Sequence, residues 1–497
     1  MTAAPYYEVF KALSAEAMLV VTAFVALALD LVSLRRAEMK TRSRTLGTVA
    51  IVGLLASVIP LWLQVRQDSV VLLGGTLVVN ELSAIFNLFI VVLTLLTVVI
   101  SMGFDVGRHV GEYYATLLFG AIGMMLLVST EELITIFVAL ELTSVCLYIL
   151  TAFHKGELRS QEAAVKYFMF GAISSAFLLF GLSYVYGLTG ATNLREIAKV
   201  IQANGASPLM AVGLLFIIVG FGFKVAVVPF HLWAPDAYEG APTPVTAFIA
   251  TGSKVASFFV FAKILIIGFG GMAGSAFWGG FNSGWTMLLA VTAVASMVLG
   301  NCMAIVQRNV KRLLAYSSIA HAGYIFVGLL AATQSGTTSV LFYVIVYALT
   351  NMGAFGVVAA LSTRAGGDDM ENFNGMARKA PFLSLLMLVF ILSLAGIPPL
   401  GGFFGKFYLF AAAVERDTQN FGLLWLVVIG IFMSAVSLYY YLILLKHIYV
   451  LPPKEDVAVA TPTYLNVALA ATALAVILLG VFPESLLELL KPLVVHL

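Results

Sequence analysis

The chain has 497 residues, of which 61% are hydrophobic and only 10% are charged, and its formal net charge is +2. Soluble domains carry about 25% charged residues, so this composition excludes an ordinary soluble enzyme and indicates a polytopic membrane protein. The two cysteines, Cys146 and Cys302, both lie in apolar segments, which argues against a disulfide framework and against a metal site.

The apolar residues form continuous runs and do not alternate with polar ones, which favours membrane helices over barrel strands. Between Arg312 and Arg364 there are 51 residues without a charged side chain, enough for two spans of about 20 residues each. In chain order, the expected spans are 17–34, 45–65, 82–104, 113–130, 133–153, 167–192, 208–229, 245–267, 284–306, 313–332, 338–362, 382–413, 421–445 and 463–483. We therefore predict an all-α membrane protein with about 14 transmembrane helices.

The orientation of these spans follows from the basic residues. The amino terminus lacks the basic start and cleavage site of a removable signal, so it is expected to form the first span. Of the 27 lysines and arginines, 17 lie in connections after odd-numbered spans and six on the opposite side. The positive-inside rule therefore places both termini on the outer, periplasmic side of a bacterial inner membrane. No connection exceeds about 20 residues, so any chemistry is expected within the membrane.

Apart from Asp30 and Lys263 near the ends of their spans, five ionisable residues lie within the predicted spans. An ion at the bilayer centre costs about 2.5 to 3.5 kcal/mol on insertion scales, so each is a functional candidate that faces a polar interior. They are Glu141 in span 5, Lys224 in span 7, Lys254 in span 8, His321 in span 10 and Lys406 in span 12.

A purely structural interpretation remains open for these charges: static ion pairs that hold helices together. One glutamate cannot neutralise three lysines, which argues against that interpretation. A lone His321 would more often be a packing histidine, but this one stands in line with the other charges. Lys263 lies near the end of its span and is expected to extend its amine to the interface. Asp30, four residues before Arg35, is expected to be an interfacial residue as well.

Unpaired lysines inside a bundle can carry protons. Burial disfavours the ammonium form and can bring the pKa of a lysine from about 10.4 toward neutrality. Two unit charges 6 Å apart at an effective dielectric of about 20 interact by about 2.8 kcal/mol. Movement of Glu141 relative to Lys224 could therefore load or unload a proton, while the ordinary pKa of a histidine already suits relay work.

Two spans are interrupted near their lysines. Span 7 runs into Pro229 in "VVPFHLW", and span 12 contains Pro398 and Pro399 in "AGIPPLGGFFGK". Interruptions at matching positions of two halves are typical of inverted repeats, because an odd number of spans inverts the second unit. We predict two inverted five-helix repeats within four segments: an N-terminal segment 1–112, a first repeat 113–267, a second repeat 284–445 and a C-terminal segment 446–497.

Three stretches resemble a known family: "FKVAVVPFHLWAPDAYEGAPTPVTAFIATGSKVASF", "NVKRLLAYSSIAHAGYIFVGL" and "AGIPPLGGFFGKFYLF". They are similar to the antiporter-like, proton-translocating subunits of respiratory complex I (NADH-quinone oxidoreductase), and the 14-span layout extends the resemblance over nearly the whole chain. "YEGAPTP", the lysine in span 12 and the short C-terminal end resemble the N type of these subunits, the counterpart of mitochondrial subunit 2.

The resemblance implies residue roles. Glu141 and Lys224 match the glutamate of helix 5 and the lysine of helix 7 that pair with each other. Lys254 matches the central lysine, and His321 and Lys406 match the histidine of helix 10 and the terminal lysine of helix 12. As accessory residues, Glu162 and Lys166 match a charged pair at the start of helix 6, and His231 matches a histidine after the helix 7 break. An interfacial i,i+4 pair and a packing role, respectively, remain alternatives for these three.

The family resemblance also implies function and partners. The chain would move protons outward from the cytoplasm, from Lys254 by way of His321 to Lys406. NAD, FMN, iron-sulfur clusters and quinone would be bound by other subunits; this chain lacks a Gly-rich fingerprint and the cysteines for a cluster. The expected partners are an antiporter-like neighbour, the small K-, J- and A-type membrane subunits and the lipid bilayer, with no nucleic acid. The alternatives are an Mrp-type sodium/proton antiporter subunit and a non-pumping membrane scaffold.

Overall fold

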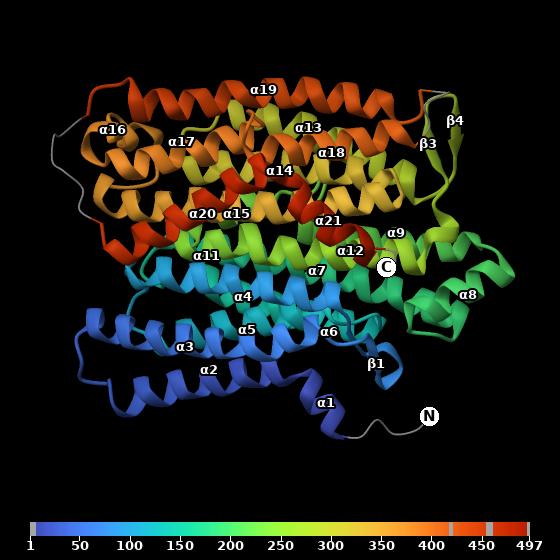
Figure 1. Cartoon of the computed structure of the whole chain (residues 1–497), viewed down its shortest axis with the longest axis horizontal. Helices are drawn as coiled ribbons and strands as arrows, with labels where there is room; N and C mark the ends of the chain where they lie inside the picture. The colour runs from blue at the N-terminus through green and yellow to red at the C-terminus, as the bar shows by residue number, and fades with distance from the viewer. Residues whose placement is uncertain (1–5, 417–420, 454–460, 495–497) are drawn as a thin grey trace. The chain divides into compact units, whose positions relative to one another are not determined.

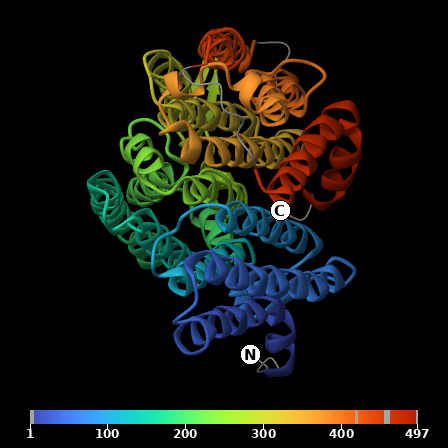
Figure 2. The same ribbon diagram turned by 90° about the vertical axis from the view of Figure 1, so that its left-hand side faces the viewer.

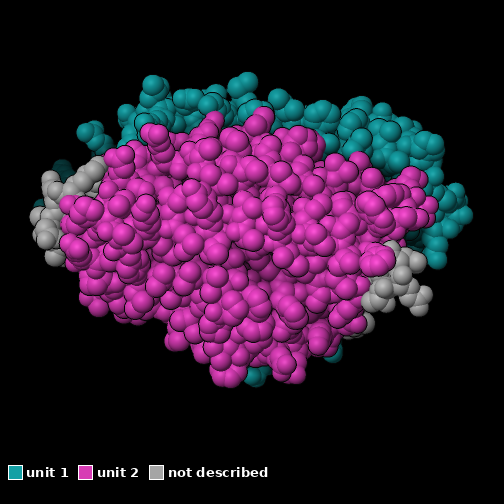
Figure 3. All heavy atoms as spheres, turned by 90° about the horizontal axis from the view of Figure 1, so that it is seen from above, with its two compact units in different colours: residues 1–224, 252–273, 497 teal, residues 225–251, 274–496 magenta. Residues whose placement is uncertain are grey.

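The computed structural model describes residues 6–416, 421–453 and 461–494. The chain divides into two compact units, coloured separately in Figure 3. Unit 1 comprises Met1–Lys224, Gly252–Ala273 and Leu497, and unit 2 comprises Val225–Thr251 and Gly274–His496.

Long apolar helices make up unit 1 and run alongside one another in Figure 1. They are α2 (Ser14–Val32), α3 (Met39–Val65), α4 (Glu81–Met102), α5 (Val110–Val128), α6 (Leu133–Thr151), α7 (Leu158–Thr189) and α9 (Pro208–Val225), whose last residue belongs to unit 2. Helix α5 packs against both α2 and α6, and α3 packs against both α2 and α4. Each helix corresponds to one predicted span.

The eighth predicted span is a continuous but irregular helix. It begins with α11 (Thr243–Phe248), passes through the π-helical turn η2 (Ile249–Ser253) into α12 (Lys254–Lys263), and ends with a second π-helical turn, η3 (Ile264–Gly268). Such π-turns are rare and occur frequently at functional sites. Lys254 and Lys263 are the first and last residues of the regular segment between the two turns.

Unit 2 contains the remaining spans, which Figure 2 shows from one end. They are α13 (Trp285–Ile305), α14 (Val310–Leu330), α15 (Gln334–Ala365), the broken pair α17 (Pro381–Ala395) and α18 (Gly401–Glu415), α19 (Leu424–Tyr449) and α20 (Thr463–Val481). The most apolar windows of α14 and α15 are completely buried, so these two helices form the core of the unit. Polar groups on them must find partners inside the protein.

Short elements connect or flank the spans. The helices are α1 (Tyr6–Ala12), α8 (Leu194–Asn204), α10 (Trp233–Gly240), α16 (Met376–Lys379) and α21 (Pro483–Val494), with 3₁₀ turns η1 (Leu73–Gly75), η4 (Gly270–Met272) and η5 (Met370–Phe373). Two antiparallel hairpins pair β1 (Val70–Leu72) with β2 (Leu77–Val79), and β3 (Ser275–Phe277) with β4 (Gly280–Asn282). The amphipathic α8 buries Leu194, Ile197 and Ile201 at helical spacing.

The predicted fold class is confirmed. Among the described residues, 13 helices are long and apolar enough to cross a membrane, and the shorter apolar helix Pro381–Ala395 is the first part of the broken twelfth span. The chain is therefore an all-α multi-span membrane protein. The break in span 12 was predicted from Pro398 and Pro399 and lies between Ala395 and Gly401.

Matched backbone contacts support the prediction of two repeats. An isolated antiparallel bridge joins Glu132, directly before α6, to Asn193, and a second joins Asn309, directly before α14, to Asp369. Each bridge thus links the start of the second helix of a predicted repeat to the loop after its third helix. The flanking hydrogen bonds also correspond: Leu133 to Thr192 and Leu194 to Glu131 in one repeat, Val310 to Asp368 and Met370 to Arg308 in the other. The segment boundaries themselves remain a prediction.

Asp30 lies near the end of α2 and is buried against the neighbouring helices. It is only 6% exposed, and its carboxylate accepts two hydrogen bonds of 2.8 Å from the Arg42 guanidinium. It also accepts one from the Gly111 backbone amide at 3.0 Å. A Cβ at Gly111 would lie 2.6 Å from that of Asp30, so the close approach of α5 requires glycine there. The carboxylate therefore joins α2, α3 and α5.

We expect Asp30→Ala to destabilise the protein by about 2 kcal/mol, because Arg42 and the Gly111 amide lose their partner in a nearly dry site. Thermal unfolding in mild detergent, followed by size-exclusion chromatography, measures the loss. Lys40→Ala, which removes an exposed charge at the start of α3, is the control. An equal unfolding midpoint for the two variants would contradict the assignment.

Candidate functional site

Glu141 and Lys224 lie in unit 1, and each is hydrogen bonded to a hydroxyl group. The Lys224 ammonium donates to the Ser144 hydroxyl and lies 3.4 Å from the Tyr148 hydroxyl, both on α6. The Glu141 carboxylate accepts a hydrogen bond from Ser175 on α7. No ion pair within 4.0 Å joins the two charges in the described part of the chain, so the predicted pair is not in direct contact. Glu141 still lies within electrostatic range of Lys224.

Lys254 occupies the interior of unit 1 at the first residue of α12. Its side chain is 1% exposed, and the polar residues Thr251, Ser253 and Ser257 around it in sequence are buried as well. The π-turn η2 directly before it shifts the register of the helix by one residue. Lys254 is therefore buried inside the protein, at an irregularity of its helix.

His321 lies in the core of unit 2, at the middle of α14, and is held between two tyrosines. Its Nδ1 is hydrogen bonded to the Tyr343 hydroxyl on α15, and its Nε2 lies 3.1 Å from the Tyr441 hydroxyl on α19. A neutral imidazole donates through only one of its nitrogens, so one hydroxyl donates to the ring and the other accepts. Transfer of a proton through the ring would reverse both roles. The Ser317 hydroxyl, 2.5 Å from that of Tyr441, extends this chain.

Lys406 is held by the helix break. Its ammonium donates to the carbonyl oxygens of Leu394 at 3.0 Å and Ala395 at 3.2 Å, the last residues of α17, and to the Ser434 hydroxyl at 2.9 Å. It also lies 5.1 Å from the centre of the Tyr324 ring. The carbonyl end of a helix carries partial negative charge, so these contacts stabilise the cation without a carboxylate. Gly396, with φ of 85°, ends α17 and leaves room for the lysine.

A cavity of about 640 Å³ opens beside Lys406 between α18 and α19. Its walls are mostly apolar and include Phe403, Phe407 and Ile431, whereas Lys406, Ser434 and Glu415 supply its polar groups. Glu415 is exposed at the end of α18. The cavity thus extends along α18 from the buried amine to a carboxylate at the helix end.

The accessory residues occupy less enclosed positions. Glu162 and Lys166 form an i,i+4 ion pair of 2.7 Å on α7, with side chains 60% and 42% exposed. His231 follows the helix 7 break at Pro229 and is 6% exposed. Its Nδ1 has no protein partner within hydrogen-bond distance among the described residues. The break itself is held in unit 2 by the Val228 amide, which donates to the Ser296 hydroxyl at 3.0 Å.

Sequence reasoning missed the tyrosines that surround these charges. Tyr324, Tyr343 and Tyr441 are fully buried beside His321 or Lys406. Buried tyrosine hydroxyls at the centre of apolar helices were the available signal, because each needs a hydrogen-bond partner. Asn301 gives two more such contacts, at 3.1 Å to the Tyr324 hydroxyl and 3.0 Å to that of Tyr440.

The prediction for the Lys263 amine was also wrong. It was expected at the membrane interface, but its side chain is 2% exposed, and its ammonium lies 3.9 Å from the Glu131 carboxylate. It donates to the Thr130 carbonyl at 3.0 Å. The loop that carries Glu131 lies against the end of α12 and encloses the amine.

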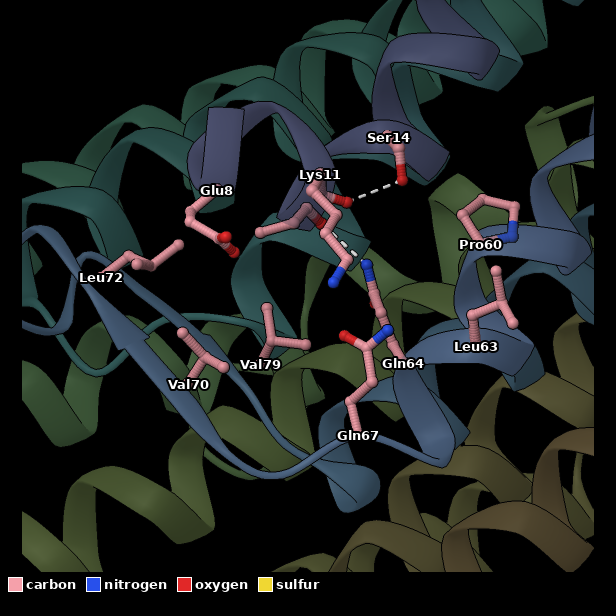
Figure 4. Close-up of a pocket in the computed structure, with 11 residues that line it drawn as sticks. Glu8, Lys11, Ser14, Pro60, Leu63, Gln64, Gln67, Val70, Leu72 and Val79 are labelled. Atoms are coloured by element: carbon pink, nitrogen blue, oxygen red, sulfur yellow. Dashed lines mark hydrogen bonds between the residues drawn. The ribbon is translucent and has the colours of Figure 1, made fainter. Parts of the chain in front are cut away.

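A separate cavity of about 110 Å³ lies in unit 1 among α1, the end of α3 and the first hairpin (Figure 4). Its polar side chains include Glu8, Lys11 and Gln64, and Gln64 donates to the Ala12 carbonyl at 2.9 Å. None of the predicted lysines lines it. Within the described residues, no cluster of three or more His, Cys, Asp or Glu side chains is arranged to hold a metal.

Known proteins share the membrane helices that carry these buried charges. A family described as NADH:quinone oxidoreductase/Mrp antiporter, transmembrane, matches residues 130–437. NADH-quinone oxidoreductase subunit N 2 of Acidobacterium capsulatum is 44% identical to the chain and covers 99% of it over 100% of its own length. The matched segment of the family includes all five intramembrane candidates.

Comparison with solved structures points to the same group of membrane proteins. A chain of respiratory complex I from Thermus thermophilus with bound aureothin is 34% identical, with a TM-score of 0.78 over 95% of this chain and 98% of that one. A chain of the Mrp complex from Dietzia sp. has a TM-score of 0.83 over 98% of this chain and 97% of that one, but at 20% identity it shows the shared fold alone. The chain belongs to the NADH-quinone oxidoreductase subunit N family, within the NADH:quinone oxidoreductase/Mrp antiporter membrane proteins.

Proposed function

We propose that this chain is a proton-translocating membrane subunit of an NADH-quinone oxidoreductase. The complex oxidises NADH and reduces quinone in other subunits, which hold the NAD, FMN, iron-sulfur clusters and quinone. This chain moves protons from the cytoplasm to the outside and acts in catalysis only as part of that assembly. The subunit N relatives and the complex I structure support the assembly, and the buried lysines support the proton route.

The contacts of Lys406 give the strongest support for the proposed proton route. A lysine that serves only as a structural cation would be expected to pair with a carboxylate when buried. Lys406 has two backbone carbonyls, a hydroxyl and an aromatic ring as partners, all of them neutral. These groups stabilise the ammonium form only moderately, so the same site can also hold the neutral amine. A group that alternates between the two forms can pass a proton on.

The proposed order of transfer begins at the cytoplasmic side and reaches Lys254. His321 then hands the proton on to Lys406, through the hydroxyls of Tyr343 and Tyr441 on either side of its ring. The last step leads from Lys406 along the cavity toward Glu415. Glu141 and Lys224 set the proton affinity of the first half through Ser144, Ser175 and their mutual electrostatic interaction.

The remaining residues have supporting roles in this proposal. Glu162 and Lys166, exposed at the start of α7, attract protons at the cytoplasmic surface. His231 follows the break at Pro229, where its free Nδ1 can accept a proton. Pro398 and Pro399 keep α17 and α18 apart, so that the α17 carbonyls remain available to Lys406. The neighbours in the assembly are an antiporter-like subunit and the small membrane subunits.

An Mrp-type sodium/proton antiporter remains the second candidate because the fold is shared. The 44% identity to a subunit N over the whole chain favours the redox complex. Purification in mild detergent distinguishes the two, since flavin and iron-sulfur subunits would accompany the chain only in the redox complex.

We expect Lys406→Met to abolish most of the proton transport that passes through this subunit while NADH oxidation continues, because methionine fills the site but cannot bind a proton. The measurement is the number of protons pumped per electron by the assembled complex in proteoliposomes. Lys446→Met, which removes an exposed lysine at the end of α19, is the matched control. An unchanged ratio in a fully assembled Lys406→Met complex would favour a static scaffold.

The proposed orientation, with both termini outside, has its own test. In a background without Cys146 and Cys302, Lys199→Cys on α8 should react with a membrane-impermeant maleimide in intact spheroplasts. Lys155→Cys, on the connection between α6 and α7, should react only after permeabilisation, because the positive-inside rule places that connection in the cytoplasm. Both positions are exposed, so accessibility alone cannot produce a difference. The reverse labelling pattern would invert the orientation.

A further inference from the structure

The smaller cavity, among α1, the end of α3 and the first hairpin, lies at the boundary of the membrane-spanning part of unit 1. Of the two spanning helices beside it, α2 begins at Ser14 and α3 ends at Val65. Its volume of about 110 Å³ is several times the roughly 30 Å³ that a water molecule occupies in the liquid. The cavity therefore has room for a compact polar group.

The walls of this cavity are held in place by contacts of α1. One side of α1 packs against the hydrophobic cluster of the first hairpin. The Gln64 side chain donates to the Ala12 carbonyl at 2.9 Å, and the Ser14 hydroxyl donates to the Lys11 carbonyl at 2.8 Å (Figure 4). The first of these bonds joins α1 to α3, and the second fixes the corner between α1 and α2. The cavity is thus formed by the protein alone.

Two opposite charges line this cavity without pairing with each other. Glu8 and Lys11 lie three residues apart on α1. In Figure 4 both side chains extend from α1 toward the side on which Gln67 lies. Within the described residues, neither charge takes part in an ion pair of 4.0 Å or less. The site therefore offers a cation, an anion and the Gln67 amide to a ligand.

Exposed aromatic residues place this end of unit 1 at the level of lipid headgroups. Tyr6, Tyr7 and Phe10 on α1 are 96%, 71% and 67% exposed. Trp62, near the end of α3, is 51% exposed, and the Arg66 guanidinium lies 5.2 Å from the centre of its ring. Tyrosine and tryptophan are enriched at membrane–water interfaces, because their rings are apolar and their polar atoms can meet water. Lipid headgroups are therefore the ligands that surround this cavity.

We propose that this cavity binds the headgroup of phosphatidylethanolamine, with the phosphate at Lys11 and the ammonium at Glu8. A primary ammonium has three hydrogens to donate, so it can bind the Glu8 carboxylate and the Gln67 amide oxygen together. Phosphatidylglycerol has the same phosphate but no ammonium. The acyl chains leave the site over Leu63, which lines the cavity and is 55% exposed. The proposed orientation places this lipid in the outer leaflet, whereas its binding does not depend on proton transport.

Photocrosslinking from two neighbouring strand positions tests for the bound lipid. Val70 and Val71 on β1 are both exposed, but only Val70 lines the cavity, because successive side chains of a strand point to opposite faces. The assembled complex, with Val70→p-benzoylphenylalanine or Val71→p-benzoylphenylalanine, is irradiated in nanodiscs of equal parts phosphatidylethanolamine and phosphatidylglycerol. Mass spectrometry then identifies the lipid adducts. At Val70 the phosphatidylethanolamine adduct should be about fivefold more abundant, as expected for one exposed ion pair, and Val71 should show no preference. Equal adducts at Val70, or none, would overturn the proposal.

Charge variants combined with the Val70 crosslinker show whether Glu8 and Lys11 select the headgroup. Glu8→Gln should remove the preference for phosphatidylethanolamine, because the ammonium loses its anion. Lys11→Gln should lower the adducts of both lipids, which share the phosphate, and leave their ratio unchanged. Lys40→Gln, at an exposed lysine at the start of α3, is the control and should change neither. If Glu8→Gln lowers both adducts without changing their ratio, Glu8 is only structural and the proposed site is wrong. If the crosslinker at Val70 prevents assembly, the same ratios are measured from Gln67, which is exposed and lines the same cavity.

A soluble ligand is distinguished from a lipid by one further sample. Glycerophosphoethanolamine carries the same phosphate and ammonium without acyl chains, and it is added to the complex in lipid-free detergent before irradiation. We expect far less adduct from it at Val70 than from phosphatidylethanolamine, because it lacks the contacts along Leu63. An adduct with the soluble compound but not with the lipid would refute the lipid assignment. None of these readouts depends on proton pumping, so the lipid site and the proposed proton route can fail separately.

Discussion

The central constraint on this protein is that amines lie inside apolar helix bundles, where an ion without compensation is costly. Lys406 shows how the cost is offset without a permanent counter-charge. The chain interrupts a helix so that the carbonyls of Leu394 and Ala395, which a continuous helix would use internally, turn toward the ammonium. These dipoles stabilise the buried cation less firmly than a carboxylate would, which is what the proposed proton transfer requires.

Two other buried ionisable groups also have neutral hydrogen-bond partners. Lys224 has hydroxyls as partners, and His321 has tyrosines on both ring nitrogens. Lys263 instead has a carboxylate close by, which it shares with Arg195, and the buried Lys311 lies 3.0 Å from the Asp368 carboxylate. The partners therefore divide these cations into two kinds, those with neutral partners and those beside a carboxylate.

Fold and site are connected through irregular backbone. The structure departs from regular α-helix at the two π-turns that flank α12, at the break after α9 and at the break between α17 and α18. Each of Lys224, Lys254, Lys263 and Lys406 lies at or near one of these places. Irregular backbone at membrane depth is tolerated where it is buried in protein or lines a polar cavity, and there it supplies free carbonyls and amides. Backbone carbonyls and amides that are not hydrogen bonded within a helix are thus available to the buried charges.

The sequence by itself determined the number of spans, the identity of the five intramembrane candidates and the break in span 12, because hydropathy, charge and proline act locally along the chain. It could not determine partners. That Asp30 binds Arg42, that Lys224 binds Ser144, and that Lys263 is enclosed were decided by tertiary structure. Each contact depends on which face of a helix meets which neighbour, and low hydrophobic periodicity in uniformly apolar helices leaves that face unspecified. Only the folded bundle brings Glu131 and Lys263, 132 positions apart in the sequence, to the same site.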